Sequence, residues 1–230
     1  MIRFSDVSEK GTSPEKIEKH TDIKPLGGMT DQEADAFWKK EFQNAHNEFS
    51  QEEYNKAKSE IYNRSEDELN IEFDIDDRLK SVLEQFAPNR WESMSDTERA
   101  EAISVFVRAL GEGLELKELP KIIVYDDQSD SYGYYDPSEN TISLNRRYFS
   151  DPPEVVNTVA HEMRHAYQHH RAELLETHED LLYKVNLENY ISPVELPDGG
   201  WLLFTDYQDQ YVEVDARAFA NLFTEAMKYE

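Results

Sequence analysis

The hydrophobic residues in the first half of the chain recur at helical intervals in four stretches. These stretches cover residues 30–45, 50–64, 76–86 and 95–110. Three of them begin with Ser or Thr and have Glu three residues later, which is the spacing of a capping box at a helix N-terminus. Gly111 is placed to end the fourth helix. The pattern therefore predicts a helical N-terminal half.

After Pro120 the pattern changes to short apolar or alternating runs. Residues 121–125, 132–135 and 141–145 are predicted to be strands separated by turns. A long helix is expected from Pro152, because proline is tolerated in the first turn of a helix. A small antiparallel or mixed sheet that packs on helices is typical of the α+β class.

The remaining hydrophobic pattern predicts a helix over residues 179–187, a strand over 201–204 and a closing helix over 208–228. We therefore divide the chain into three parts: a flexible leader (1–28), a helical N-terminal region (29–118) and a mixed domain (119–230).

The chain has a net charge of −25 and contains no cysteine. Nucleic acids and anionic membranes bind cationic surfaces, so neither is expected as a partner. The charge would favour a basic peptide substrate, or it simply keeps the protein soluble. Without cysteine, any metal must be held by His and carboxylate side chains. The sequence shows no apolar signal segment, so we expect a cytoplasmic protein, with export by a dedicated system left open.

His161 and His165 lie four residues apart in the helix that is expected from Pro152. This spacing places both imidazoles on one face of the helix, about 6 Å apart along its axis, where they can bind one tetrahedral zinc ion. Glu162 can take a proton from the water that the zinc activates and pass it to the leaving amine. We therefore predict a zinc peptidase, against the alternative that three fixed positions match by coincidence.

A third ligand must come from another part of the chain. The metzincin pattern would need glycine and histidine where this chain has Gln168 and Arg171. Glu213 is the best-placed carboxylate, because the small alanines that follow it allow close packing of the closing helix against the histidine helix. The other candidates are Asp215, Glu176 and Asp209. Asp215 could instead orient a histidine without touching the metal.

The segment His161-Glu-Met-Arg-His165, the sheet before it and the Glu213-x-Asp-Ala segment resemble the glutamate zincins, or gluzincins. More particularly, they are similar to small bacterial and phage-associated zincins of intracellular or toxin-like type. The resemblance covers roughly residues 120–228. It implies that residues 119–230 form a zincin-like metallopeptidase domain with Zn²⁺ as its cofactor.

The resemblance also implies that the last strand before the histidine helix is a sheet edge, to which an extended peptide substrate adds. That role would fall to residues 134–135 or 141–144. Thermolysin-like enzymes carry an aspartate four residues after the glutamate ligand, whereas this chain has Arg217 there. A hydrogen-bond partner for the histidines must therefore come from elsewhere.

Turnover also needs a donor to the oxyanion that forms on the substrate. Tyr207 and Tyr211 are candidates because they lie near Glu213 in the sequence, and we choose Tyr211 as the catalytic tyrosine. The alternative for each tyrosine is a role in packing.

Three other interpretations stay open. The chain could be a non-catalytic metal-binding protein whose acidic, helical N-terminal half docks a protein partner. It could be a toxin or effector domain of zincin fold that is delivered to other cells. The N-terminal half could also cover the active site, in which case deletion of residues 1–90 would raise activity.

Overall fold

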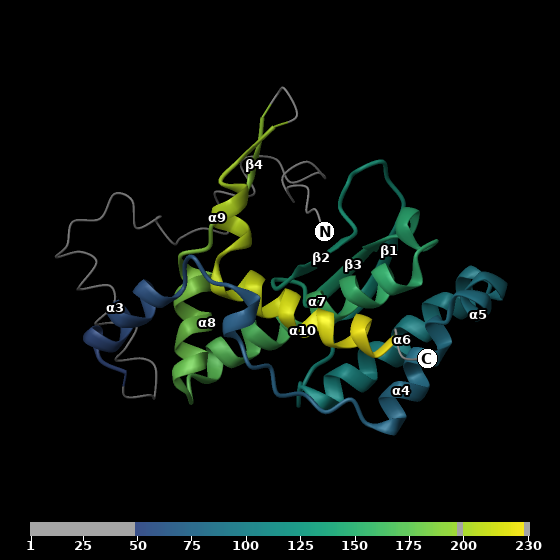
Figure 1. Cartoon of the computed structure of the whole chain (residues 1–230), viewed down its shortest axis with the longest axis horizontal. Coiled ribbons are helices and arrows are strands. Elements are labelled where there is room, and N and C mark those ends of the chain that lie inside the picture. Colours follow the sequence, from purple (N-terminus) through teal and green to yellow (C-terminus); the bar gives the residue numbers. More distant parts are fainter. Residues whose placement is uncertain (1–48, 197–199, 228–230) are drawn as a thin grey trace.

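The computed structural model describes residues 49–196 and 200–227 (Figure 1). The predicted leader (1–28) and the helix predicted over 30–45 lie outside the described residues. Within them, the molecule is mostly helical and has one three-stranded sheet. The predicted α+β class is therefore confirmed. No helix in this part of the chain combines the length and the apolar character that crossing a membrane requires.

The sheet consists of β1 (Lys121–Tyr125), β2 (Gly133–Asp136) and β3 (Thr141–Asn145), in the order β1-β3-β2. β1 runs parallel to β3, and β2 runs antiparallel to it, so the sheet is mixed. β3 is the central strand, and residues 141–144 therefore cannot offer a free edge to a peptide. Of the two predicted edge segments, only 134–135 in β2 lies at an edge of the sheet.

Two helices cross at the centre of the molecule: α7 (Pro152–Leu174) and α10 (Tyr211–Ala226) (Figure 1). Each packs against the other more extensively than against any other element. The closing helix predicted over 208–228 is present as α10, and a separate short helix, α9 (Phe204–Gln208), precedes it. Phe204 belongs to α9, so the predicted strand over 201–204 is shorter than expected.

Four helices precede the sheet in the described part of the chain: α3 (Gln51–Glu60), α4 (Asp77–Leu83), α5 (Pro88–Ser93) and α6 (Asp96–Gly113). The capping boxes predicted for the second and fourth stretches are present at the starts of α3 and α6. In each, a serine hydroxyl accepts a hydrogen bond from a backbone amide, and a glutamate three residues later accepts one in return.

The prediction that α6 ends at Gly111 is wrong, because the helix continues to Gly113. A Cβ atom on Gly111 would lie 2.0 Å from Cδ2 of Leu119, so glycine here lets the Leu119 side chain of the following loop pack directly on the helix. The chain leaves the helix at Glu115, which has a positive φ of 55°. Gly111 therefore serves packing and does not terminate the helix.

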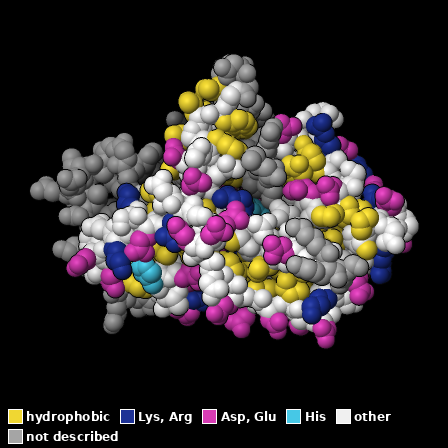
Figure 2. Space-filling model, viewed as in Figure 1, with side chains coloured by type: hydrophobic (Ala, Val, Ile, Leu, Met, Phe, Trp, Pro, Cys, Tyr) yellow, Lys and Arg dark blue, Asp and Glu magenta, His cyan; other side chains and the backbone are white. Residues whose placement is uncertain are grey.

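After α7 come α8 (His178–Glu188) and a hairpin of β4 (Val194–Glu195) and β5 (Trp201–Leu202). The hairpin projects from the body of the molecule in Figure 1, and Figure 2 shows hydrophobic side chains on it. Leu202 is 52% exposed. The hairpin is therefore an apolar surface beside the two central helices.

The N-terminal helices share the hydrophobic core with α7 and α10. Leu83, Phe86 and Phe106 belong to one cluster with Val159 and Phe223. A second cluster brings α3 against α8 and α10 through Tyr54, Ala57, Ile61, Leu181 and Val212. Each of the two clusters therefore contains residues from both sides of the predicted boundary at 118/119.

We expect that a chain lacking residues 1–90 will not fold. The deletion removes Ile61, Leu83 and Phe86, and each buried side chain of this size contributes about 1.5–3 kcal/mol. Their combined loss approaches the entire stability of a typical domain, about 5–15 kcal/mol. Thermal unfolding followed by circular dichroism should show no cooperative transition. A folded fragment with raised activity would instead support a regulatory N-terminal half.

Candidate metal centre

Three side chains from the two central helices converge on one point. His161 and His165 project from α7, and Glu213 projects from the first turn of α10. The Nε2 atoms of the two imidazoles are 3.0 Å apart. Each lies 3.5 Å from a different carboxylate oxygen of Glu213. One nitrogen or oxygen from each residue lies within 4.8 Å of the others, so the three can hold a metal ion.

Burial sets the protonation of this cluster. Burial lowers the pKa of His161 to about 4, although the hydrogen bond and the negative charge of Glu213 act to raise it. The imidazole is therefore neutral at neutral pH and offers a lone pair. Burial alone would raise the pKa of Glu213, but the two imidazoles outweigh it and lower this pKa to about 2. The cluster thus presents a neutral His161 and a carboxylate anion.

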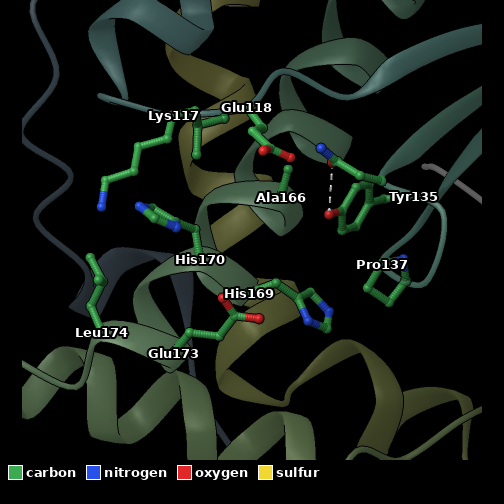
Figure 3. A pocket seen from close by; sticks show the side chains of 11 residues that line it. Lys117, Glu118, Tyr135, Pro137, Ala166, His169, His170, Glu173 and Leu174 are labelled. Carbon is green, nitrogen blue, oxygen red and sulfur yellow. Dashed lines mark hydrogen bonds between the residues drawn. The ribbon is translucent and has the colours of Figure 1, made fainter.

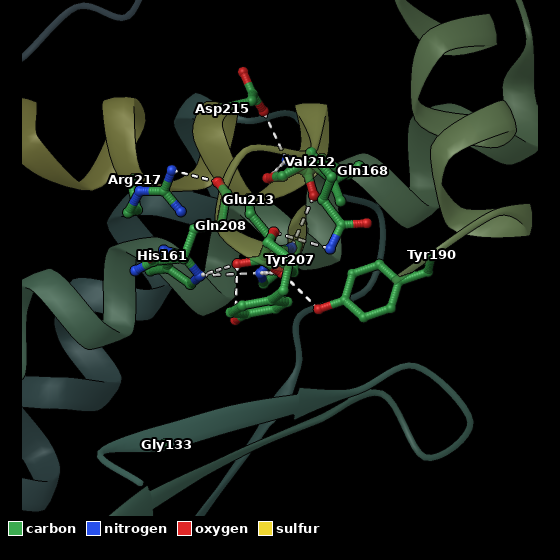
Figure 4. A network of polar contacts seen from close by, with 12 residues as sticks. Gly133, His161, Gln168, Tyr190, Tyr207, Gln208, Val212, Glu213, Asp215 and Arg217 are labelled. Atoms are coloured by element: carbon green, nitrogen blue, oxygen red, sulfur yellow. Dashed lines mark hydrogen bonds and ion pairs between the residues drawn. The ribbon is translucent and has the colours of Figure 1, made fainter. Parts of the chain in front are cut away.

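Two tyrosine hydroxyls fix the carboxylate of Glu213 (Figure 4). The Tyr190 hydroxyl donates to Oε1 at 2.6 Å, and the Tyr207 hydroxyl donates to Oε2 at 3.0 Å. Burial and the charge of Glu213 raise the pKa of both phenols well above the usual value, so they remain protonated donors. Each oxygen of Glu213 therefore accepts one hydrogen bond and keeps lone-pair capacity for a cation.

Tyr190 lies between α8 and β4, and no sequence signal pointed to it. Gln210 holds this segment, because its side-chain amide donates to the carbonyl of Ile191 and its oxygen accepts from the Ile191 amide. Tyr190 is 40% exposed, but its hydroxyl end is buried against Glu213. Its position depends on the fold around Gln210, and hydrophobic periodicity does not reveal it.

Glu162 lies on α7 between the cluster and the edge strand β2. The backbone amide of Tyr135 donates a hydrogen bond to its carboxylate. No partner for Oε1 is present among the described residues, although the side chain is almost fully buried. Burial, and then the charge of Glu213, raise the pKa of Glu162 well above its usual value. A divalent cation in the cluster would reverse this effect and favour the carboxylate form.

No strand in the described part of the chain pairs with the outer edge of β2, and this edge faces Glu162. The Asn145 amide donates to the Tyr132 carbonyl at 2.8 Å, so this residue pair is hydrogen-bonded. Such pairs alternate along an antiparallel ladder, and the backbone of Gly133 and Tyr135 therefore points away from β3. A Cβ atom on Gly133 would lie 2.9 Å from Cγ2 of Thr158 on α7. Glycine thus lets the edge strand approach the histidine helix closely.

A chain of polar contacts lies behind His165. Its Nδ1 atom is 2.8 Å from Oε1 of Gln168, whose Nε2 donates to Asp215 at 2.7 Å. Asp215 also accepts two hydrogen bonds from the guanidinium of Arg164, at 2.8 and 2.9 Å. Asp215 therefore contacts the histidine only through Gln168. The contact between Gln168 and His165 could have been predicted from the sequence, because position 168 lies about one turn after position 165 on the same helix face.

Tyr211 does not reach the cluster. Its ring stacks on Tyr183 with centroids 5.5 Å apart, and its hydroxyl donates to Glu179 at 3.3 Å. Being the first residue of α10, it points to the face that packs on α8. Of the two tyrosines named from the sequence, Tyr207 is the one that lies at Glu213. Among the described residues the cluster includes none of the alternative carboxylates Asp215, Glu176 and Asp209.

A cavity of about 500 Å³ is lined in part by Tyr135 and His169 (Figure 3). It is enclosed by the C-terminal half of α7, the turn after β2 and the loop before β1. The Tyr135 ring packs near His169, with centroids 5.7 Å apart. The lining includes Lys117, Glu118, Ala166, His170 and Glu173. Ala166 lines the cavity and is four residues after Glu162 on α7, so the cavity lies about one helical turn from that glutamate.

Residues 87–185 match a metallopeptidase family. The family is described as "Putative metallopeptidase family (DUF6782)". The match covers less than half of the chain; it includes His161, Glu162 and His165 but not Glu213. No curated protein and no solved structure matches the chain. The chain is thus similar to a metallopeptidase family over its central part, and the cluster supplies side chains for a metal.

Proposed function

We propose that the protein is a zinc-dependent peptidase of the gluzincin type. The observation that carries this proposal is the convergence of His161, His165 and Glu213, with Glu162 beside them. The similarity of residues 87–185 to a metallopeptidase family supports a peptidase in particular. Zinc is the metal that two imidazoles and one carboxylate typically hold in a catalytic site.

The spacing of the donor atoms supports a tetrahedral ion. In a tetrahedron with bonds of about 2.0–2.1 Å, neighbouring donor atoms are about 3.3 Å apart. The separations here are 3.0 Å between the two imidazole nitrogens and 3.5 Å from each nitrogen to Glu213. No rearrangement of the helices is needed to place an ion between them. Three protein ligands leave a fourth position for water or substrate.

A zinc ion in this position would polarise a peptide carbonyl and lower the pKa of a water molecule. Glu162 accepts the proton from that attacking water, and it delivers the proton to the amine that leaves. The Tyr135 amide holds one end of the Glu162 carboxylate, while Oε1 has no partner among the described residues. Oε1 is therefore the atom that we assign to the transferred proton.

An extended peptide would bind along the free edge of β2. The outward-facing backbone groups of Gly133 and the carbonyl of Tyr135 can pair with a substrate strand, which brings it past Glu162, while the Tyr135 amide holds that glutamate. A substrate side chain on the face of α7 would enter the cavity beside Tyr135. The Tyr190 hydroxyl lies at the cluster, whereas that of Tyr211 faces Glu179, so Tyr190 is the better candidate to donate to the substrate oxyanion once it turns away from Glu213.

The proposal is tested by metal analysis together with digestion of a peptide library. We expect one zinc ion per chain, hydrolysis that stops when a chelator removes the zinc, and recovery when zinc is added back. Glu213→Ala should lose zinc and hydrolysis together. Glu176→Ala is the matched control, because the side chain of this exposed glutamate pairs with Arg171 and is not part of the cluster. Purified protein without stoichiometric zinc, or zinc-loaded protein that cleaves no peptide, would overturn the proposal.

A further inference from the structure

Gln168 lies between His165 and the buried pair of Asp215 and Arg164, and it is fully buried. Its Oε1 is 2.8 Å from His165 Nδ1. Its Nε2 donates two hydrogen bonds, to the Asp215 carboxylate at 2.7 Å and to the Val212 carbonyl at 2.8 Å. Every polar atom of this amide therefore has a partner, and each partner belongs to α7 or α10.

The chemistry of these partners determines which way the amide points. A carboxylate and a backbone carbonyl can only accept hydrogen bonds, so the NH₂ group must face Asp215 and Val212. The opposite orientation would place the amide oxygen against two buried acceptors, where no hydrogen bond can form, and would waste the two N–H donors of the amide. The oxygen of Gln168 therefore faces His165, where it can only accept.

The same polarity determines the tautomer of His165. Its Nδ1 must carry the hydrogen that is donated to Gln168, because the amide oxygen has none. Nε2 then carries the lone pair, and this is the atom that faces His161 and Glu213. Arg164 holds the Asp215 side chain in place with two hydrogen bonds, one to each of its oxygens.

We infer that Gln168 is a positioning residue that fixes the tautomer and ring orientation of His165, and that Asp215 acts on the metal ligand by setting the direction of the Gln168 amide. The effect on zinc rests on the proposed function, whereas the tautomer is a property of the protein alone. Thermolysin-like enzymes have an aspartate at the position of Arg217, but Arg217 pairs with Glu66 in this structure. Gln168 is instead the residue that hydrogen-bonds to the histidine.

The test compares Gln168→Met with Tyr183→Phe in the full-length protein. Tyr183 belongs to the same network, because its hydroxyl donates to Asp215 at 3.2 Å and accepts from Arg164, but among the described residues it has no hydrogen bond with Gln168 or His165. Side-chain ¹⁵N NMR of the metal-free protein, at a pH where imidazoles are neutral, reports the His165 tautomer. Competition with a chelator reports zinc affinity.

We expect the wild type and Tyr183→Phe to show the Nδ1-protonated tautomer, with zinc affinities within about threefold of each other. Gln168→Met should lose the uniform tautomer and bind zinc about 10–100-fold more weakly. The double variant Gln168→Glu/Asp215→Asn should recover most of the affinity, because it keeps an acceptor next to Nδ1 and one negative charge in the network. If Gln168→Met does not fold, this double variant and Tyr183→Phe supply the comparison.

The inference fails if Gln168→Met keeps the wild-type tautomer, or if Gln168→Met and Tyr183→Phe lose zinc affinity equally. It also fails if the double variant folds but shows a mixed tautomer. A wild-type protein that binds no zinc would defeat the proposed function, and the tautomer measurement would still decide the inference.

Discussion

Replacing Glu162 with glutamine is expected to lower kcat/KM for peptide hydrolysis by about 10²–10⁴-fold, which is the usual contribution of a general base. Glutamine has nearly the same shape, but its amide cannot take up a proton from water. Glu162 is not one of the three converging side chains, so zinc content should stay at the wild-type level. The loss should therefore appear in zinc-loaded protein.

The stability of Glu162→Gln gives a second, independent measurement. Burial and the charge of Glu213 disfavour the ionised form of Glu162 in the metal-free protein. Removing this ionisable group should leave the metal-free variant at least as stable to urea as the wild type. A residue that serves function at a cost in stability behaves in this way.

Glu154→Gln is the matched control for Glu162→Gln. Glu154 is a partly buried glutamate on the same helix, eight residues earlier and thus about 12 Å away along the axis. Its replacement should leave kcat/KM within about threefold of the wild type. If Glu162→Gln retains more than a tenth of the wild-type kcat/KM with a full zinc content, Glu162 is not the proton acceptor.

Replacing Arg164 with methionine is expected to lower the free energy of unfolding by about 3–5 kcal/mol, because it leaves a buried carboxylate without its cation. Arg164 and Asp215 are both buried, and two hydrogen bonds join them. The guanidinium also lies 4.5 Å from the centre of the Tyr167 ring and 5.1 Å from that of Phe219. Methionine can fill the space but cannot donate to Asp215.

Urea unfolding of the metal-free protein measures this change, with Arg146→Met as the control. Arg146 pairs with Asp96 and Asp126, but all three side chains are exposed. Its loss should cost no more than about 1 kcal/mol, as for other surface ion pairs. The double variant Arg164→Met/Asp215→Leu should be less destabilised than Arg164→Met, because no unpaired charge remains. Equal effects of Arg164→Met and Arg146→Met would show that the buried pair contributes little.

Local spacing was sufficient for the part of the site that lies on one helix. His161 and His165 share a face of α7 because four residues make just over one turn. Glu162 lies near the site because it is adjacent to His161 in the sequence. The starts of α3 and α6 were equally local, since a capping box involves residues three apart. Gly111 was misjudged because its role depends on Leu119, which approaches only in the folded chain.

The tyrosines show the limit of sequence proximity. Tyr211 is two residues before Glu213, yet residues two apart on a helix point in nearly opposite directions, and Tyr211 packs against α8. Tyr190 is 23 residues from Glu213 and donates to it at 2.6 Å. Separation along the chain is therefore a poor guide to contact wherever a loop returns to a helix end.

The sequence by itself determined the longer helices of the described residues, the strand segments, the pair of histidines with their glutamate, and the need for carboxylate ligands in a chain without cysteine. These features depend on neighbours within about one helical turn or on composition. Only the tertiary structure decided the strand order, the meeting of Glu213 with the histidines and the direction of the Gln168 amide. Those depend on how α7, α8 and α10 pack, because buried polar groups must find partners on other elements once water is excluded.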